Sequence, residues 1–430
     1  MGQERKVLTL ALMKAENSGY SNLILDHALR ENHLEGTAAR FVTSCFYGVL
    51  ERKISIDFVL NRFLKRPVHK ATPYTAAVLR SGAYQILFMD KVPASAAVNE
   101  SVELVRRSRE KFNAGLTNAV LRKVAAEDVR RTVLENPNPG IRYSVNDWIW
   151  EALSNDLGRE QAEAFLADSL LPPPVFIRIN TKAENALGLV RAELEPLGGT
   201  LRETEISDCF LAQGMRGIEG LNTYRQGLFF VQDLSSRLCA SAVDAKPGMR
   251  VLDCCAAPGG KSFSVALAME DRGEVISADL HPHRVGLIAE GAQRLGLSSI
   301  KPRVLDASVF DPNLGLFDRV LCDVPCSGIG VIRRKPEIKY KSNAECAALP
   351  EIQKSILSAA ADYVKPGGRL IYSTCTLLKR ENEAVVEWFL NRRPEFTALP
   401  AFCDKENGRY TRFPPFDAGD GFFAAVLERK

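Results

Sequence analysis

The sequence contains no long apolar run and no paired cysteine spacing. Among its 430 residues, 46% are hydrophobic and 25% are charged, but none of the apolar runs approaches the roughly 20 residues of a membrane-spanning helix. The ten cysteines are scattered, and the five histidines form no cluster with them, so no zinc site is expected. The N-terminal apolar stretch is broken by Lys14 and Glu16 and does not resemble a signal peptide. We therefore expect a cytoplasmic protein with reduced thiols, no metal and no membrane partner.

Two common nucleotide-binding motifs are also absent. The stretch at residues 251–262, VLDCCAAPGGKS, has Cys255 where a P-loop requires glycine, and no G-x-G-x-x-G fingerprint occurs. What it does contain is a short apolar run, a turn at Pro258, Gly259 and Gly260, and a helical pattern that follows. This order is typical of a nucleotide pocket at the carboxyl edge of the first strand of an open α/β sheet, where helix-start amides can bind an anion. An ordinary strand–helix turn fits the glycines equally well.

The charge balance is only mildly basic. A formal net charge of +4 permits an RNA or DNA partner without requiring one. Residues 1–135 have apolar residues at helical spacing and few strand signals, which indicates a helical bundle. Its basic residues gather in groups, which form either a solvated helix face or a surface that contacts phosphates: Arg52, Lys53, Lys65, Arg66, Arg106, Arg107, Arg109 and Lys111.

The rest of the chain divides at turn-rich stretches. Residues 136–140, NPNPG, form the clearest linker. A small helical and α+β module follows, with a strand at 175–180, and from about residue 249 strands and helices alternate as in a doubly wound parallel sheet. We expect strands at 250–254, 274–280, 301–305, 319–323 and 369–374, with a turn at 365–368 before the fifth. The expected domains are 1–140 (all-α), 141–235 (small module) and 236–430 (α/β sheet), in a monomer.

Acidic residues and cysteines follow successive predicted strands. Because parallel strands end at one edge of a sheet, these side chains should gather there: Asp253, Asp279, Asp306, Asp323, Cys326 and Cys375. Asp279 lies about twenty residues beyond the glycine turn, where a carboxylate can bind both ribose hydroxyls, and Asp306 could bind an adenine amine. A single aspartate at such a position is often a helix cap. The prediction of a cofactor site therefore depends on the whole set of strand-end residues. The two cysteines could form a redox pair, but no C-x-x-C motif is present. Cys254 is expected only to pack.

Several strings resemble those of RNA 5-methylcytosine methyltransferases. They are VLDCCAAPGGKS, ADLHPHR, DVPCSGIGVIRRKPEIK, STCT and the closing DGFF. Residues 1–135 resemble the NusB-like RNA-binding domain, and the combination is similar to the RsmB (Sun/Fmu) family of 16S rRNA cytosine-C5 methyltransferases. The resemblance implies a class I, Rossmann-like methyltransferase sheet, preceded by an α+β module and an all-α NusB-like domain.

The resemblance also implies site residues. Cys375, the cysteine of the TC motif, would attack carbon 6 of cytosine, Cys326 of the PC motif would assist product release, and Asp323 would contact the base and protonate N3. S-adenosylmethionine would be bound by the strand-end residues and the glycine turn, with Arg284 nearby: Cys255, Ala256, Ala257, Pro258, Gly259, Gly260, Lys261, Asp279, Arg284, Asp306 and Asp323. The basic residues after the PC motif would hold the RNA backbone, unless they are solvated loop charges: Arg333, Arg334, Lys335 and Lys339.

Three other functions stay open. The same chemistry could act on tRNA, since the catalytic half alone does not separate the two substrates. The chain could be a non-catalytic RNA-binding factor, although the PC and TC cysteines argue against this. A dinucleotide-dependent oxidoreductase is disfavoured by the missing glycine fingerprint.

Overall fold

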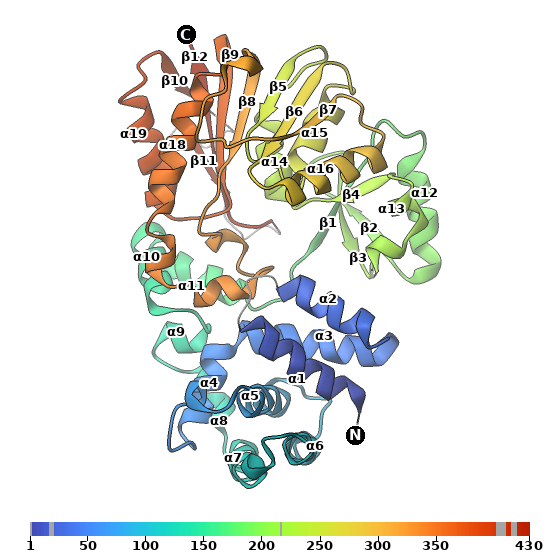
Figure 1. Ribbon diagram of the computed structural model, residues 1–430, viewed down its shortest axis with the longest axis vertical. Helices are drawn as coiled ribbons and strands as arrows, with labels where there is room; N and C mark the ends of the chain where they lie inside the picture. The colour runs from blue at the N-terminus through green and yellow to red at the C-terminus, as the bar shows by residue number, and fades with distance from the viewer. Residues whose placement is uncertain (1, 17–20, 216, 401–409, 414–418) are drawn as a thin grey trace. The chain divides into compact units, whose positions relative to one another are not determined.

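The structure is a computed structural model that describes residues 2–16, 21–215, 217–400, 410–413 and 419–430 (Figure 1). Two compact units are present. The first comprises the chain up to Leu171 together with Ile332–Asn343, and the second comprises Pro172–Val331 and Ala344–Lys430. Within the described residues, no helix is both long and apolar enough to cross a membrane. The division predicted at residues 140 and 235 stays a prediction, and the contacts of the first unit continue through 136–140 to Leu171.

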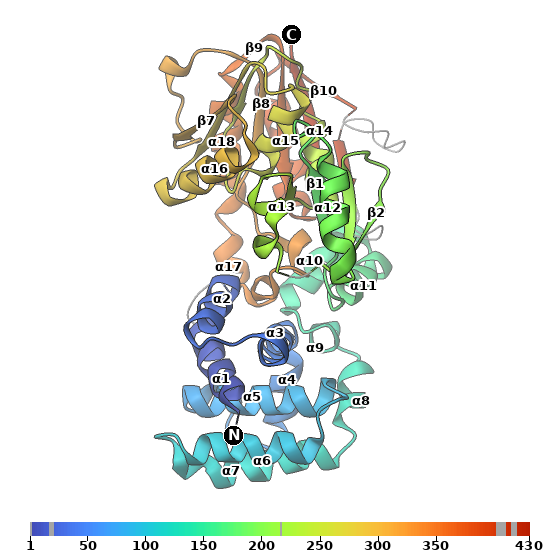
Figure 2. The same ribbon diagram turned by 90° about the vertical axis from the view of Figure 1, so that its right-hand side faces the viewer.

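The first unit is built of helices, as expected. Apolar residues at helical spacing, such as Val98, Val102 and Val105 on one helix and Val120 and Val124 on the next, are buried between neighbours. Helices α6 and α7 lie side by side (Figure 2). The helices are α1 (Gln3–Ala15), α2 (Ser21–Glu31), α3 (Gly36–Glu51), α4 (Lys53–Asn61), α5 (Pro73–Phe88), α6 (Ala94–Arg106), α7 (Ala114–Ala126), α8 (Val129–Leu134), α9 (Pro139–Arg142), α10 (Asp147–Leu157) and α11 (Arg159–Asp168).

A segment from much later in the chain completes this unit. Residues 332–343 contain the 3₁₀ turn η7 (Pro336–Tyr340) and contact α3. Asn146 donates hydrogen bonds to the carbonyls of Tyr340 and Lys341, each at 2.9 Å. Trp148 Nε1 donates to Lys341 O at 2.7 Å. The segment that follows the PC motif is therefore held by helices of the N-terminal half.

The second unit begins with a small antiparallel sheet. Its strand order is β2-β3-β1-β4, with β1 at Val175–Ile179, β2 at Thr200–Glu203, β3 at Cys209–Gln213 and β4 at Phe229–Val231. Helix α12 (Ala186–Leu194) packs Val190 and Leu194 against Ile177 and Phe210 of the sheet. This matches the predicted α+β module.

The large sheet has the strand order β10-β12-β9-β8-β5-β6-β7, with β11 paired to β12. Five strands run parallel to one another: β5 (Arg250–Asp253), β6 (Glu274–Asp279), β7 (Ile300–Val304), β8 (Phe317–Asp323) and β9 (Val364–Thr374). The last strand, β12 (Phe422–Arg429), is antiparallel to β9 and also pairs with β10 (Phe396–Leu399) and β11 (Tyr410–Phe413). The predicted doubly wound fold is confirmed, with an antiparallel edge.

Helices cover both faces because successive strand residues point to opposite sides. Val251 packs with α15 (Gly260–Ala268) and α16 (Pro282–Leu295), whereas Leu252 packs with α18 (Leu349–Ala361) and α19 (Glu383–Leu390). Helix α14 (Leu234–Ser241) precedes β5 and contacts α15. The central strands β5 and β8 are therefore buried between two helical layers.

The structure differs from the sequence predictions in two places. The predicted turn at 365–368 lies inside β9, where Gly367 takes a positive φ of 73° and the pairing with β8 shifts register. A glycine turn and a bulged strand share the same residue signals. Strands β10 and β11 were not predicted at all.

Candidate functional site

The predicted site residues follow the ends of five parallel strands. Asp253, Asp279 and Asp323 are the last residues of β5, β6 and β8, and Asp306 and Cys375 closely follow β7 and β9. Because these strands are parallel and adjacent, the carboxyl ends form one edge of the sheet. The expectation that the side chains share an edge is met.

The glycine turn between β5 and α15 leaves the helix start uncovered. Gly259 has φ +114°, a conformation that favours glycine, and α15 has no side-chain cap at its N-terminus. A Cβ built on Gly260 would meet no main-chain atom within 4 Å. The first amides of the helix are therefore without a side-chain cap.

Asp279 and Arg284 link this turn to the end of β6. The Asp279 carboxylate is 4% exposed and lies 3.1 Å from Arg284 Nη1, and Arg284 Nη2 donates to Ala257 O at 3.0 Å. Arg284 thus holds the glycine turn beside Asp279. Asp306 is exposed, and hydrogen bonds from Ser308 lower the pKa of its carboxyl group.

Asp323 is bound by a cation from the glycine turn. Lys261 Nζ lies 2.6 Å from Asp323 Oδ2, and Ser373 Oγ donates to Asp323 Oδ1 at 2.8 Å. The pKa of Lys261 is raised. Burial by itself would lower this pKa, but the negative charge of Asp323 and weaker contributions, including one from Cys375, have the larger effect. Lys261 therefore stays a cation. It contacts Asp323, and its charge interacts with the Cys375 sulfur.

The two cysteines lie side by side, with their Sγ atoms 3.2 Å apart. The hydrogen bond with Cys375 and burial raise the pKa of Cys326 well above its ordinary value. Either thiol can be the hydrogen-bond donor in this contact. Cys254, in contrast, is buried against Cys322 with a sulfur–sulfur distance of 3.9 Å, in the packing role expected of it.

A buried polar scaffold that sequence reasoning missed holds the two cysteine loops. The fully buried Glu381 accepts from Ser327 N at 2.8 Å and from Gln353 Nε2 at 3.1 Å, and Gln353 Nε2 also donates to Pro325 O at 3.0 Å. The Ser327 and Thr376 hydroxyls are hydrogen-bonded at 2.8 Å. Glu381 lies in the charged string KRENE, which looks like an exposed helix start, so only its position directly after the TC motif could have singled it out.

Asp253 is the most deeply buried acid at this edge. Its side chain accepts a hydrogen bond from Ser262 Oγ at 2.7 Å, while Oδ1 has no partner among the described residues. Burial raises the pKa of its carboxyl group to about 7, with a further contribution from Asp323. A carboxyl group of this kind gains or loses its proton near neutral pH.

The basic residues after the PC motif lie elsewhere. Arg333 Nη1 is 2.9 Å from Asp168 Oδ2, and Lys339 is completely buried. Burial lowers the pKa of Lys339 to about 7. The prediction that Lys339 contacts the RNA backbone was wrong, because a buried ammonium group cannot reach phosphate. Arg333 and Lys339 belong to the first unit, whereas Lys335 is exposed and its contact with RNA stays a prediction.

The residues at the glycine turn offer the donors and acceptors that S-adenosylmethionine requires. The amides at the start of α15, which have no side-chain cap, suit a carboxylate. The Asp279 carboxylate at the end of β6 suits ribose hydroxyls, and the exposed Asp306 can accept from an amine. In the described part of the chain, no group of His, Cys, Asp and Glu side chains could hold a metal ion.

Comparison with known proteins gives concordant results. Residues 240–428 match the family model "16S rRNA methyltransferase RsmB/F", and residues 3–126 match the NusB family. A probable ribosomal RNA small subunit methyltransferase B of Bacillus subtilis is 38% identical over 99% of this chain and 98% of its own. A probable methyltransferase of the same name from Synechocystis is 34% identical over 95% of each chain.

Solved structures agree with this relationship. The crystal structure of PH0851 has a TM-score of 0.86 and 26% identity, and the match covers 100% of this chain and 99% of that one. NSun6 from Pyrococcus horikoshii, solved with SFG, has a similar fold over 65% of this chain and 97% of that one, with a TM-score of 0.58 and 21% identity. On sequence, on domain content and on fold, this chain belongs to the RsmB family of methyltransferases.

Proposed function

We propose that this protein methylates carbon 5 of a cytosine in 16S rRNA through a covalent adduct with Cys375. The observation that carries the proposal is the 3.2 Å separation of the Cys375 and Cys326 sulfur atoms at the strand edge that also holds the glycine turn. The family membership supports an RNA substrate, and rRNA places the reaction in the bacterial cytoplasm.

Cys375 supplies the nucleophile. Carbon 5 of cytosine is a poor nucleophile, and addition of a thiolate to carbon 6 converts the ring to an enamine that is reactive at carbon 5. The Lys261 ammonium has a favourable electrostatic interaction with Cys375. The Cys326 thiol can donate a hydrogen bond to the Cys375 sulfur across the 3.2 Å contact. When bound, S-adenosylmethionine supplies the methyl group that carbon 5 takes up. Cys326 is assigned to the release of the product.

Asp323 recognises the base in this proposal, although in a different way from the one expected. A neutral carboxyl group that protonates N3 needs surroundings without a cation, whereas Lys261 Nζ lies 2.6 Å from Asp323 Oδ2. We therefore assign Asp323 as a hydrogen-bond acceptor for the exocyclic amine of cytosine, which uracil lacks. Lys261 and Ser373 hold the carboxylate in place.

The target base must leave its stack to reach the cysteine. An unpaired loop is therefore the easier substrate, and the helical unit and the α+β module supply further contacts to RNA. The test is to incubate the protein with 16S rRNA or tRNA and S-adenosylmethionine labelled in the methyl group, and to map the modified base. Label at carbon 5 of a cytosine in 16S rRNA supports the proposal. Label confined to tRNA would favour the alternative substrate, and a protein that binds no S-adenosylmethionine would be an RNA-binding factor.

A further inference from the structure

The two cysteine sulfurs are close enough to react with each other. Cys326 Sγ lies 3.2 Å from Cys375 Sγ, whereas the sulfur atoms of a disulfide bond are about 2 Å apart. The pair therefore has to close by roughly 1 Å, which small rotations about the side-chain bonds of the two residues can supply. No step of the methyl transfer forms a bond between these two sulfurs.

Hydrogen bonds between the two cysteine loops hold the sulfurs beside each other. The loops follow β8 and β9, which are adjacent strands, and Gly330 N donates to Cys375 O at 3.0 Å. The residues directly after the two cysteines are joined as well, because the Ser327 and Thr376 hydroxyls are hydrogen-bonded at 2.8 Å. The loops cannot separate without the loss of these bonds, so the sulfurs stay within reach of each other.

The pair is partly accessible to solvent, in contrast to another close pair of sulfurs in the same sheet. Cys326 and Cys375 are both only partly buried, and so is the contact between them. The sulfurs of Cys254 and Cys322 are 3.9 Å apart, but these two residues are 1% and 0% exposed. Because a thiol must meet an oxidant before it can react, exposure favours oxidation of the pair at the strand edge.

We propose that Cys326 and Cys375 form a site of reversible oxidation, at which a hydroperoxide converts the two thiols to a disulfide and thereby stops methyl transfer. The loss of activity rests on the proposed function, because a sulfur in a disulfide cannot attack carbon 6. The formation of the disulfide needs neither RNA nor cofactor. In the cytoplasm disulfides are usually transient, catalytic or redox-sensing, and thiol reductants would restore the two thiols.

The oxidation proceeds in two steps. In the first, Cys375, whose sulfur interacts with the Lys261 charge, attacks the hydroperoxide. An S–O bond forms and the O–O bond breaks, the departing oxygen takes the thiol proton as an alcohol or water, and the sulfur becomes a sulfenic acid. In the second step Cys326 attacks this sulfur. The S–S bond forms, the S–O bond breaks, and the hydroxyl group leaves as water with the proton of Cys326.

The experiment is treatment of the reduced full-length protein with hydrogen peroxide, followed by mass spectrometry. We expect the intact mass to fall by two hydrogen atoms, and a cross-linked tryptic peptide to join Cys326 to Cys375. Fragmentation of this peptide separates Cys326 from Cys322, which lies on the same tryptic peptide. Methyl transfer to rRNA should be lost and should return after dithiothreitol, while the affinity for S-adenosylhomocysteine in calorimetry stays unchanged.

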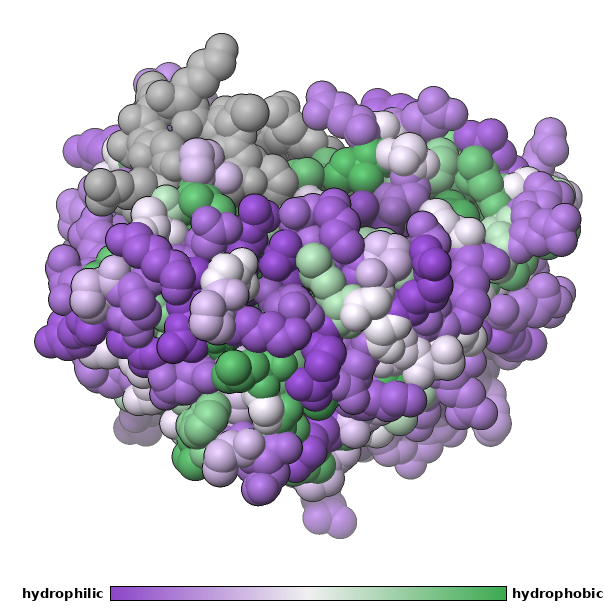
Figure 3. Space-filling view, turned by 90° about the horizontal axis from the view of Figure 1, so that it is seen from above, coloured by the Kyte–Doolittle hydropathy of each residue, from purple (hydrophilic) through white to green (hydrophobic). Residues whose placement is uncertain are grey.

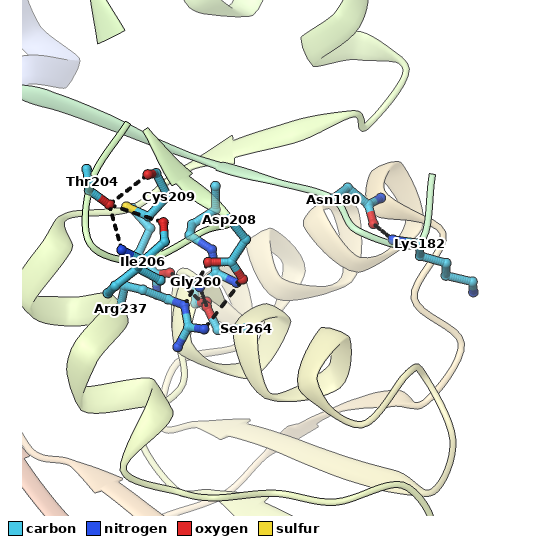
Figure 4. Close-up of polar contacts among 11 residues, drawn as sticks. Asn180, Lys182, Thr204, Ile206, Asp208, Cys209, Arg237, Gly260 and Ser264 are labelled. Carbon is cyan, nitrogen blue, oxygen red and sulfur yellow. Dashed lines mark hydrogen bonds and ion pairs between the residues drawn. The ribbon is translucent and has the colours of Figure 1, made fainter. Parts of the chain in front are cut away.

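Two variants serve as controls. Cys326→Ser removes the second thiol, so Cys375 should gain oxygen atoms instead, and dithiothreitol should not restore it once the sulfinic acid has formed. Cys209→Ser removes a buried cysteine of β3 whose main-chain carbonyl accepts from Thr204 Oγ1 at 2.8 Å (Figure 4). This variant should form the disulfide and recover from it as the unaltered protein does.

Three other results would overturn the inference. Oxygen atoms on Cys375 without a cross-link would mean that the two sulfurs cannot join. A cross-link between Cys254 and Cys322 would mean that exposure does not select the pair, and loss of S-adenosylhomocysteine binding would mean general damage. A protein that methylates rRNA but forms no disulfide would contradict this inference alone. A protein that forms the disulfide but, when reduced, methylates no RNA would instead contradict the proposed function and support the oxidation site.

Discussion

Two sulfur atoms at 3.2 Å define the chemistry available to Cys375 and Cys326. A single cysteine at a strand end would be unremarkable, because free cysteines are usually buried and inert. Here both are only partly buried, and a cation lies nearby. The two sulfurs therefore have different surroundings. The Lys261 charge interacts favourably with Cys375, whereas burial and the hydrogen bond with Cys375 raise the pKa of Cys326.

Removal of the two sulfurs should have different consequences. Cys375→Ala should abolish methyl transfer, because no adduct can form at carbon 6. Cys326→Ala should instead leave protein covalently attached to RNA, because the first half of the reaction proceeds and release does not. Denaturing gel electrophoresis with labelled rRNA distinguishes the two. Normal turnover by Cys375→Ala would remove the basis for the adduct, and free turnover by Cys326→Ala would remove its role in release.

Asp253 should make stability depend on pH. Its pKa is about 7 in the folded protein, against an ordinary value of 3.8, so between these values the folded state keeps a proton that the unfolded chain has lost. Its favourable contribution is therefore complete below pH 3.8 and is lost as the pH rises through 7, by roughly 1.4 kcal/mol per pH unit at most.

Asp253→Asn removes this titration and preserves an acceptor for Ser262. In denaturant unfolding at pH 5, 6 and 7, we expect the variant to gain stability relative to the unaltered protein at each step. Asp26→Asn, on the exposed face of α2, serves as the control. A stability difference that is the same at every pH would mean that Asp253 does not titrate in this range.

At the scale of elements, three loops meet at Gly330. Its N–H donates to Cys375 O at 3.0 Å, and its carbonyl accepts from Gly421 N at 2.9 Å. The PC loop, the TC loop and the turn before β12 are therefore joined by main-chain hydrogen bonds, which set the position of Cys326 relative to Cys375. The closing DGFF string of the sequence belongs to this junction.

Gly330→Ala should separate these loops. A Cβ at this position would lie 1.9 Å from Gly421 O and 2.9 Å from Cys375 O, so the backbone must move. We expect kcat to fall about 100-fold, while S-adenosylhomocysteine still binds with its original affinity in calorimetry. Gly286→Ala on α16, where an added Cβ meets nothing within 4 Å, should leave both unchanged. Unchanged kcat in Gly330→Ala would show that this junction does not position the cysteines.

The segment 332–343 links the PC loop to the helical unit. It starts directly after Val331, and Asn146 binds two of its carbonyls at 2.9 Å. Removal of these hydrogen bonds by Asn146→Ala should cost about 2 kcal/mol and expose the segment. Limited trypsin digestion should then cut faster after Arg334 or Lys341. Asn99→Ala, a substitution at an exposed position on α6, should not change the pattern. Equal cleavage rates would mean that the segment is held by its other contacts.

At the scale of the whole molecule, a net charge of +4 leaves RNA affinity to local surfaces. The face in Figure 3 is mostly hydrophilic, with apolar residues in separate patches. In the helical unit, Arg109 and Lys111 are exposed, next to Phe112, which is 74% exposed. Arg106 and Arg107 both form ion pairs with Glu103. Arg109 and Lys111 are therefore the better candidates for contacts with phosphate.

Reversal of both charges, Arg109→Glu with Lys111→Glu, tests this surface. We expect rRNA affinity to fall about tenfold at low salt and the slope of log Kd against log salt to decrease by about two, with no change in cofactor binding. The same reversal at Arg130 and Arg131, which already pair with Asp90 and Glu135, should matter less. Equal effects would mean that the basic residues form only a solvated face. The monomeric state expected from the sequence stays a prediction, which sedimentation can check.

Much of the fold could be predicted because it depends on local signals. Alternating strands and helices, helical spacing in the first 135 residues and the glycine turn each depend on neighbours in the chain. The strand-end residues followed from the geometry of parallel sheets alone. The inclusion of 365–368 in strand β9, the strands β10 and β11 and the burial of Lys339 could not be predicted, because each depends on partners far away in the sequence.

By itself, the sequence determined which residues can do chemistry: the PC and TC cysteines, the strand-end aspartates and the glycine turn. Only the tertiary structure decided their states. It brought the Lys261 ammonium to within 2.6 Å of Asp323, and it placed the Cys326 and Cys375 sulfur atoms 3.2 Å apart. The physical reason is that a residue's type sets which protons and bonds are available, whereas burial and charged neighbours, which come from distant parts of the chain, set which of them are used.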